Sequence, residues 1–147
     1  MIAVDTNILV YAHRVEAPKH RLALARLEKL AGGGVPFGIP VFCLGEFVRV
    51  VTHRRVFDPP STLEQALGAL RALLISPSAR ILNPGDDFFQ NLTAAAHEAR
   101  ATGNLAFDAQ IVAVCREHGV GTILSEDRDF QRFTRFQVVG LDDPEGQ

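Results

Sequence analysis

Short apolar runs alternate with longer amphipathic stretches along this chain. The short runs are typical of buried strands and cover residues 2–4, 37–39, 79–82, 122–124 and 137–139. The longer stretches have helical spacing and cover residues 8–12, 20–31, 40–52, 62–75, a segment from the turn at 83–85 to residue 100, and 104–118. Strands that alternate with helices usually pair in parallel, so the pattern predicts a three-layer α/β domain built on a parallel sheet.

Local signals mark where several of these elements begin and end. Ser61, followed three residues later by Glu64, has the spacing of a capping box and predicts the start of the fourth helix. Gly103 is expected to end the fifth helix. No linker or repeat divides the chain, so we expect one domain over residues 1–141 and a frayed tail over 142–147.

Composition narrows the class of protein without naming a partner. The chain has 147 residues, of which 47% are hydrophobic and 22% charged, as expected for one globular domain. Its net charge of −2 means that the chain as a whole has no positive field that would attract nucleic acid. Asp5 interrupts any signal peptide, and no apolar run reaches the roughly 18 residues of a membrane span, so a cytoplasmic protein is expected. Cys43 and Cys115 match no zinc spacing and are expected to be reduced core residues.

Four acidic residues interrupt or follow apolar runs, where an unpaired carboxylate is costly. Asp5 and Asp127 come after predicted strands, and the carboxyl ends of parallel strands are where function gathers. Glu46 and Asp108 lie on apolar faces of predicted helices. If the fold brings the four together, their repulsion raises their pKa values unless a cation lies among them. The pattern therefore predicts a divalent-metal site with oxygen ligands.

Each acid also has an ordinary structural explanation. Asp5 has the position of a helix N-cap, and Asp127 that of a solvated loop residue. Glu46 could form a buried ion pair with Arg49, three residues on. Asp108 lies in the first turn of its helix, where the dipole favours a negative charge. The joint occurrence of all four favours a shared site over four separate explanations.

The order of these segments resembles the PIN domain, and most closely the VapC ribonuclease toxins of toxin–antitoxin pairs. The resemblance rests on Ile2-Ala3-Val4-Asp5-Thr6-Asn7-Ile8-Leu9, the Glu46 helix, the start of the Asp108 helix, and Ser125-x-Asp127-x-Asp129-Phe130. It runs from the first strand through Phe130 and departs from the family mildly at Ser125, where Thr is frequent. It implies a PIN-like fold, with a parallel sheet of about five strands flanked by helices.

The resemblance also implies an activity: a divalent-metal-dependent endoribonuclease toxin that hydrolyses RNA phosphodiester bonds by metal-activated water. The cofactor would be Mg²⁺ or Mn²⁺. Asp5 and Asp108 would bind the metal directly, and Glu46 and Asp127 would complete the site, partly through water. Asp129 is an alternative to Asp127 as the fourth acid.

Further residues carry over by their position in the same motifs. Thr6 and Ser125 match hydroxyl positions that support the carboxylates. Arginines that could contact RNA phosphates are Arg49, Arg54, Arg55 and Arg128. The first three lie near the predicted end of a helix, where cations also complement the helix dipole. The expected partners are RNA, a cognate antitoxin protein and a second copy of the chain in a homodimer.

Three other functions remain open from the sequence. One is a PIN nuclease of RNA processing outside any toxin–antitoxin pair. Another is a catalytically silent binding module, although such a module has no need of four costly carboxylates. The third is an aspartyl phosphatase, which would normally carry a second Asp two residues after Asp5, where this chain has Asn7.

Overall fold

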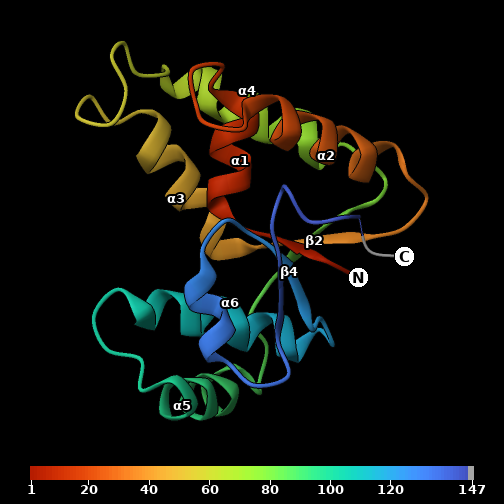
Figure 1. Cartoon of the computed structure of the whole chain (residues 1–147), viewed down its shortest axis with the longest axis vertical. Helices are drawn as coiled ribbons and strands as arrows, with labels where there is room; N and C mark the ends of the chain where they lie inside the picture. Colours follow the sequence, from red (N-terminus) through yellow and green to blue (C-terminus); the bar gives the residue numbers. More distant parts are fainter. Residues whose placement is uncertain (146–147) are drawn as a thin grey trace.

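In the computed structural model, which describes residues 1–145, a five-stranded, all-parallel sheet runs through the molecule (Figure 1). The strands are β1 (Ala3–Val4), β2 (Phe37–Pro40), β3 (Ala79–Leu82), β4 (Thr122–Leu124) and β5 (Gln137–Val139). Their order across the sheet is β3-β2-β1-β4-β5. The predicted α/β class, the parallel pairing and the five strands are confirmed.

Helices cover both faces of this sheet and make the three layers (Figure 1). They are α1 (Thr6–His13), α2 (His20–Gly32), α3 (Val41–Val51), α4 (Leu63–Leu74), α5 (Phe88–Ala99) and α6 (Leu105–Glu117), with a short 3-10 helix, η1 (Arg128–Arg132). Helices α1 to α4 pack together on one side, and α5 and α6 pack against each other on the other side. No helix within residues 1–145 has both the length and the apolar character for a membrane crossing.

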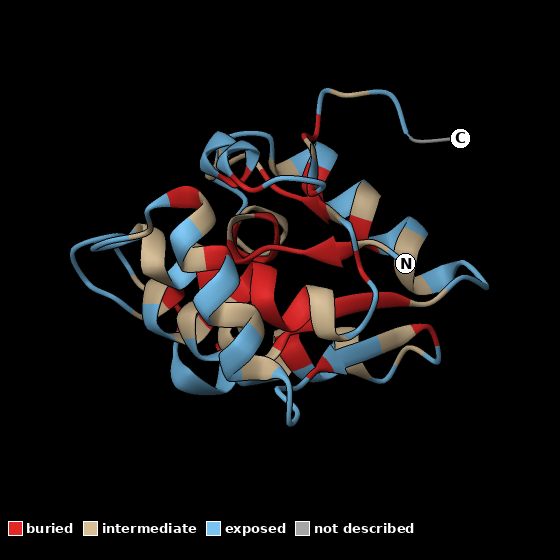
Figure 2. Cartoon of the chain, turned by 90° about the horizontal axis from the view of Figure 1, so that it is seen from below, coloured by how far each residue is buried: buried red, intermediate tan, exposed pale blue. Residues whose placement is uncertain are grey.

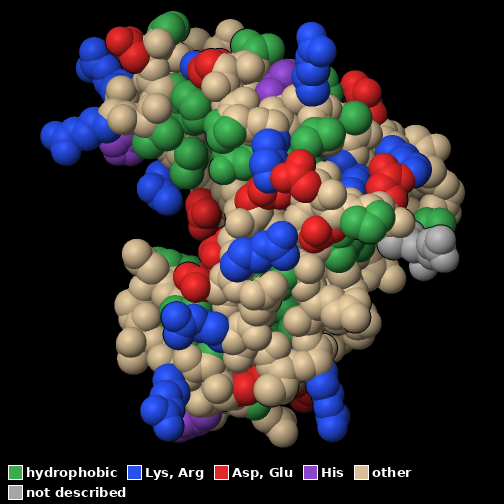
Figure 3. All heavy atoms as spheres, in the orientation of Figure 1, with side chains coloured by type: hydrophobic (Ala, Val, Ile, Leu, Met, Phe, Trp, Pro, Cys, Tyr) green, Lys and Arg blue, Asp and Glu red, His purple; other side chains and the backbone are tan. Residues whose placement is uncertain are grey.

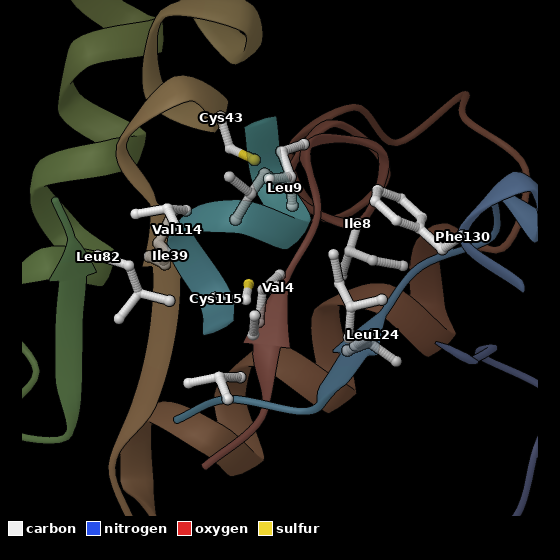
Figure 4. Close-up of a cluster of buried hydrophobic side chains, with 14 of the residues drawn as sticks. Val4, Ile8, Leu9, Ile39, Cys43, Leu82, Val114, Cys115, Leu124 and Phe130 are labelled. Atoms are coloured by element: carbon white, nitrogen blue, oxygen red, sulfur yellow. The ribbon is translucent and has the colours of Figure 1, made fainter. Parts of the chain in front are cut away.

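The hydrophobic core lies between these layers. Figure 2 shows buried strands in the middle of the molecule and partly exposed helices around them. The strands contribute Val4, Ile39 and Leu124, and Figure 4 shows these side chains among apolar residues of the helices. Cys43 and Cys115 are free and buried in this core, as predicted. Such burial on both faces explains why the central strands β2, β1 and β4 are largely apolar without alternation, whereas the edge strands β3 and β5 are partly exposed.

The start of α4 differs from the prediction by one residue. Thr62 is the N-cap: its side chain accepts from the Gln65 N–H at 3.1 Å, and the Gln65 side chain accepts from the Thr62 N–H at 2.9 Å. The capping box predicted at Ser61 and Glu64 is therefore wrong. The Ser61 hydroxyl has a tertiary partner instead, the Nε2 atom of His13 at 2.8 Å. Two overlapping capping-box patterns occur here, and local sequence alone did not separate them.

The end of α5 also differs. The helix ends at Ala99, and Arg100 adopts the left-handed conformation with a φ of 51°. The next N–H, from Ala101, donates to the carbonyl of Ala96 at 2.8 Å and closes the helix. Gly103, which was expected to end this helix, has a φ of 59° and precedes α6 instead.

Part of the predicted tail contacts α2. Lys19, which precedes that helix, lies 2.5 Å from a carboxylate oxygen of Asp142. Arg26 lies 3.7 Å from a carboxylate oxygen of Glu145. The last two residues of the predicted tail, 146–147, lie outside the described residues. The division into a domain and a tail stays a prediction.

Candidate metal centre

Two neighbouring strands bring Asp5 and Ser125 to the same edge of the sheet. Val4 of β1 pairs in register with Leu124 of β4, so the residues that follow them emerge side by side. The Asp5 N–H continues this ladder and donates to the Leu124 carbonyl at 3.1 Å. Parallel pairing thus places a carboxylate beside a hydroxyl from a position 120 residues away in the sequence.

Hydrogen bonds fix the Asp5 carboxylate, which is 7% exposed. Its Oδ1 atom accepts from the Thr6 N–H at 2.8 Å, as in an N-cap. Its Oδ2 atom accepts from the Ser125 hydroxyl at 2.6 Å and from the Asn7 amide at 3.2 Å. The cap interaction therefore accounts for only one oxygen, and the other is held by Asn7 and by a tertiary contact from Ser125.

Asn7 and Ser125 tie the β1–α1 junction to the segment after β4. The Ser125 oxygen accepts from the Asn7 amide at 3.2 Å and from the Asp127 N–H at 2.9 Å. The Asn7 side-chain oxygen accepts from the Glu126 N–H at 3.3 Å. Asn7 was not among the site residues predicted from the sequence. Its place two residues after Asp5 was the available signal, but its partners appear only in the fold.

Thr6 supports Asp5 through its backbone rather than through its hydroxyl. The Thr6 side chain is 3% exposed, and within residues 1–145 its Oγ1 atom has no hydrogen-bond partner. Thr6 lines the same small cavity as Asp5 and the other acids. A buried hydroxyl without a protein partner is costly, so this atom fits a site that also holds water or an ion.

Helices α3 and α6 bring Glu46 and Asp108 to this edge. Helix α6 leads into β4 and therefore runs back along the sheet, which puts its first turn at the carboxyl ends of the strands. A cavity of about 290 Å³ is lined by Asp5, Glu46, Asp108 and Asp127 together. Three of these acids also line an adjoining hollow of about 770 Å³. Figure 3 shows a deep notch in the surface with acidic side chains at its inner end.

The alternative explanations for the acids do not account for this grouping. Among residues 1–145, no ion pair involves Asp5, Glu46, Asp108 or Asp127, and the pair that Glu46 could form with Arg49 is not observed. The carboxylates line one cavity, and no direct ion pair among residues 1–145 offsets their charge.

The pKa values of two carboxyls reflect this crowding. Burial raises the pKa of Asp5 to about 6, against the effect of its hydrogen bonds. Burial raises the pKa of Asp108 to about 7, and the charge of Asp127 is the next contribution. Glu46 acts on both groups in the same direction. A cluster with these properties binds a proton or a cation more readily than isolated carboxylates do.

The donor set fits a hard divalent cation. Asp108, Asp127 and Asp129 each offer a carboxylate oxygen, and these oxygens all lie within 4.8 Å of one another. Carboxylate oxygens are the ligands that Mg²⁺ and Mn²⁺ prefer. Asp129 is exposed and lies 3.5 Å from Arg132, whereas Asp127 lines both hollows. The Asp129 N–H donates to Asp127 Oδ1 at 2.9 Å, which fixes the Asp127 side chain.

The predicted RNA-contacting arginines lie in different surroundings. Arg49 is exposed and lines the larger hollow with the acids. Arg54 and Arg55 are exposed in the segment after α3 and line neither hollow. Arg128 is exposed, lies 3.7 Å from Asp143 and lines neither hollow, although it directly follows Asp127. The structure therefore brings one of the four arginines to the acidic cluster.

Comparison with known proteins adds a family to this geometry. The PIN domain family matches residues 2–135. Ribonuclease VapC43 of Mycobacterium tuberculosis is 41% identical over 137 residues, which cover 93% of this chain and 92% of that protein. Ribonuclease VapC31 of the same organism is 34% identical over 139 residues, covering 95% and 97% of the two chains.

Solved structures share the fold at lower sequence identity. The structure of VapBC2 from Rickettsia felis, bound to a DNA fragment from its promoter, matches with a TM-score of 0.69 at 20% identity, covering 95% of this chain and 98% of that one. The structure of VapC20 from Mycobacterium tuberculosis, a toxin that cleaves the sarcin–ricin loop, matches with a TM-score of 0.66 at 20% identity, covering 92% and 98%.

Proposed function

The chain belongs to the VapC ribonucleases of the PIN domain family, and from this premise we propose that it is a divalent-metal-dependent endoribonuclease, the toxin of a toxin–antitoxin pair. The observation that carries the proposal is the grouping of Asp5, Glu46, Asp108 and Asp127 around one cavity. These residues come from separate elements, and none of them is neutralised by a cation within residues 1–145.

The acids have distinct roles in the proposal. Asp5 and Asp108 bind Mg²⁺ or Mn²⁺ directly, and Glu46 and Asp127 complete the site, partly through water. Asp127 is the fourth acid rather than Asp129, because Asp127 lines both hollows. When bound, the cation neutralises charge on the phosphodiester and lowers the pKa of water.

The protein positions the reacting groups. Ser125 donates to Asp5, and its oxygen accepts from the Asp127 N–H, so one hydroxyl orients two acids of the site. The remaining carboxylates of the cluster accept the proton of the attacking water. Arg49, at the edge of the same hollow, contacts a phosphate of the RNA backbone. Arg54 and Arg55 contact RNA phosphates farther from the cleavage site. Arg128 also contacts an RNA phosphate, which replaces its contact with Asp143.

The proposal includes two protein partners. The relatives from Rickettsia felis and Haemophilus influenzae are described as VapBC assemblies. By that analogy a small antitoxin protein covers the acidic cleft of this chain. The proposal also includes the homodimer that the family resemblance implies. Growth of a bacterial host tests the toxin role: expression of the chain alone arrests growth, and continued growth by cells that contain active protein contradicts it.

The ribonuclease activity is tested by substitution of the acids. We expect cleavage of cellular RNA with Mg²⁺ or Mn²⁺, and a loss of at least about 100-fold in Asp5→Asn and Asp108→Asn, because each change removes a charged ligand. Asp87→Asn is the control, since Asp87 is exposed before α5 and lines neither hollow. If Asp5→Asn and Asp108→Asn both cleave RNA at the wild-type rate, the proposed metal site is wrong.

A further inference from the structure

Phe107 has a position that folding does not explain. All ten phenylalanines of the chain lie within residues 1–145, and eight of them are buried or half-buried. Phe107 is 60% exposed, and Phe89 is 76% exposed. Neither ring belongs to the hydrophobic core of the described residues. An aromatic ring left in water contributes little to stability, so the exposed face of Phe107 calls for another explanation.

The ring of Phe107 lies in the cleft of the acidic cluster. Phe107 directly precedes Asp108 in the first turn of α6 and lines the hollow of about 770 Å³ with that acid. Phe42 lines the same hollow from α3, but its ring packs against Phe88 at 5.8 Å between centroids. Within the described residues no such aromatic neighbour is found for Phe107. A flat apolar surface therefore adjoins the predicted metal ligands.

Unpaired RNA offers the complementary surface. Bases of single-stranded RNA are not buried in a helix, and they stack on aromatic side chains in a way that depends little on sequence. A base stacked next to Asp108 would bring its own phosphate toward the acidic cluster. We propose that Phe107 forms a nucleobase subsite that holds one unpaired base of the RNA beside the cleavage site. This inference rests on the proposed ribonuclease function.

A protein partner fits this surface less well. The hollow also contains the polar side chains of Asn104 and Gln110 and the acids Asp127 and Asp129, so Phe107 is not the centre of a continuous apolar patch. Its volume of about 770 Å³ lies in the range of pockets that enclose a single small ligand, such as one nucleotide. The subsite therefore has the size and the chemistry for a base.

Base stacking is measured by fluorescence in the absence of cleavage. The probe is a pool of single-stranded RNA of mixed sequence with 2-aminopurine at one fixed position, in EDTA. We expect wild type to quench the probe, Phe107→Leu to bind it roughly tenfold more weakly with little quenching, and Phe107→Tyr to restore both. Leucine keeps apolar volume and favours helix, so α6 is retained. Phe89→Leu is the matched control, because Phe89 lines neither hollow.

Cleavage kinetics supply the second readout. Phe107→Leu is expected to raise KM about tenfold and to change kcat less than about threefold, because the ring holds the substrate and does not touch the reacting atoms. If Phe107→Leu quenches the probe as strongly as wild type and has the wild-type KM, the nucleobase subsite is wrong. It is also wrong if the only defect of Phe107→Leu is weaker binding to another protein chain. A wild type that quenches the probe but never cleaves RNA contradicts the ribonuclease proposal and not the subsite, so the two failures are distinct.

Discussion

At the scale of single residues, Ser125 connects the site. Its hydroxyl hydrogen goes to Asp5, and its oxygen accepts from the Asn7 amide and the Asp127 N–H. The acids could be found from the sequence because a carboxylate in an apolar run is conspicuous. Asn7 could not be found in this way, because an amide after a strand is ordinary turn chemistry and its partner lies 118 residues away.

Replacing Ser125 tests this connection. Ser125→Ala removes a hydrogen bond that lowers the pKa of Asp5, so we expect that pKa to rise above about 6 and the acid limb of the cleavage profile to move to higher pH. Cleavage falls roughly 10- to 100-fold. Ser125→Thr keeps the hydroxyl and serves as the control. Equal pH–rate profiles for Ser125→Ala and wild type would show that the hydroxyl does not act on Asp5.

Asp108 provides a stability test at the same scale. Its folded pKa of about 7 exceeds the ordinary 3.8, so the fold retains a proton that the unfolded chain releases. Without metal, stability therefore falls as pH rises from about 4 to about 7. We expect Asp108→Asn to be about 1–2 kcal/mol more stable than wild type at pH 7.5, less than the full shift implies because this half-buried group is screened by solvent.

Urea unfolding at two pH values checks this effect. The advantage of Asp108→Asn should shrink toward zero as the pH falls to about 4, because the Asp108 carboxyl is then protonated in the fold and begins to be protonated in the unfolded chain as well. Asp87→Asn, outside the cleft, should match wild type at both pH values. An advantage that is equal at both pH values would mean that charge repulsion is not its source.

At the scale of elements, the sequence predicted the presence of each helix and strand more accurately than it predicted their ends. The strands Ala79–Leu82 and Thr122–Leu124 match their predicted bounds, because short runs rich in branched apolar residues favour a strand both at a central, buried position and at a partly exposed edge such as that of β3. Helix ends depend on single hydrogen bonds, and these compete with tertiary contacts. Ser61 bonds to His13 and leaves the cap of α4 to Thr62, and Arg100 ends α5 without a glycine.

The cap of α4 gives a prediction at this scale. Thr62→Ala removes the acceptor for the Gln65 N–H, so the free energy of unfolding should fall by about 1 kcal/mol. Glu64→Gln is the control, because Glu64 belongs to the capping box that does not form, and it should cost less than about 0.5 kcal/mol. Denaturant unfolding compares the two variants, and the opposite ranking would restore the earlier start of the helix.

At the scale of the whole molecule, the parallel sheet explains why distant acids meet. Asp5 and Asp127 follow strands that are neighbours in the sheet, while α3 follows β2 and α6 precedes β4 at the same edge. The alternation of strands and helices in the sequence predicts that functional residues gather at this edge of the sheet. It does not predict the distances, because those depend on how α3 and α6, which both line the larger hollow, are placed relative to each other.

Anomalous diffraction from crystals soaked in Mn²⁺ tests the central claim most directly, since it locates the cation among the side chains. We predict a strong peak bound by Asp108 together with Asp5 or Asp127, and its loss in crystals of Asp108→Asn. A cleft without a peak at neutral pH, or a peak held only by surface acids such as Asp142 and Asp143, would contradict it.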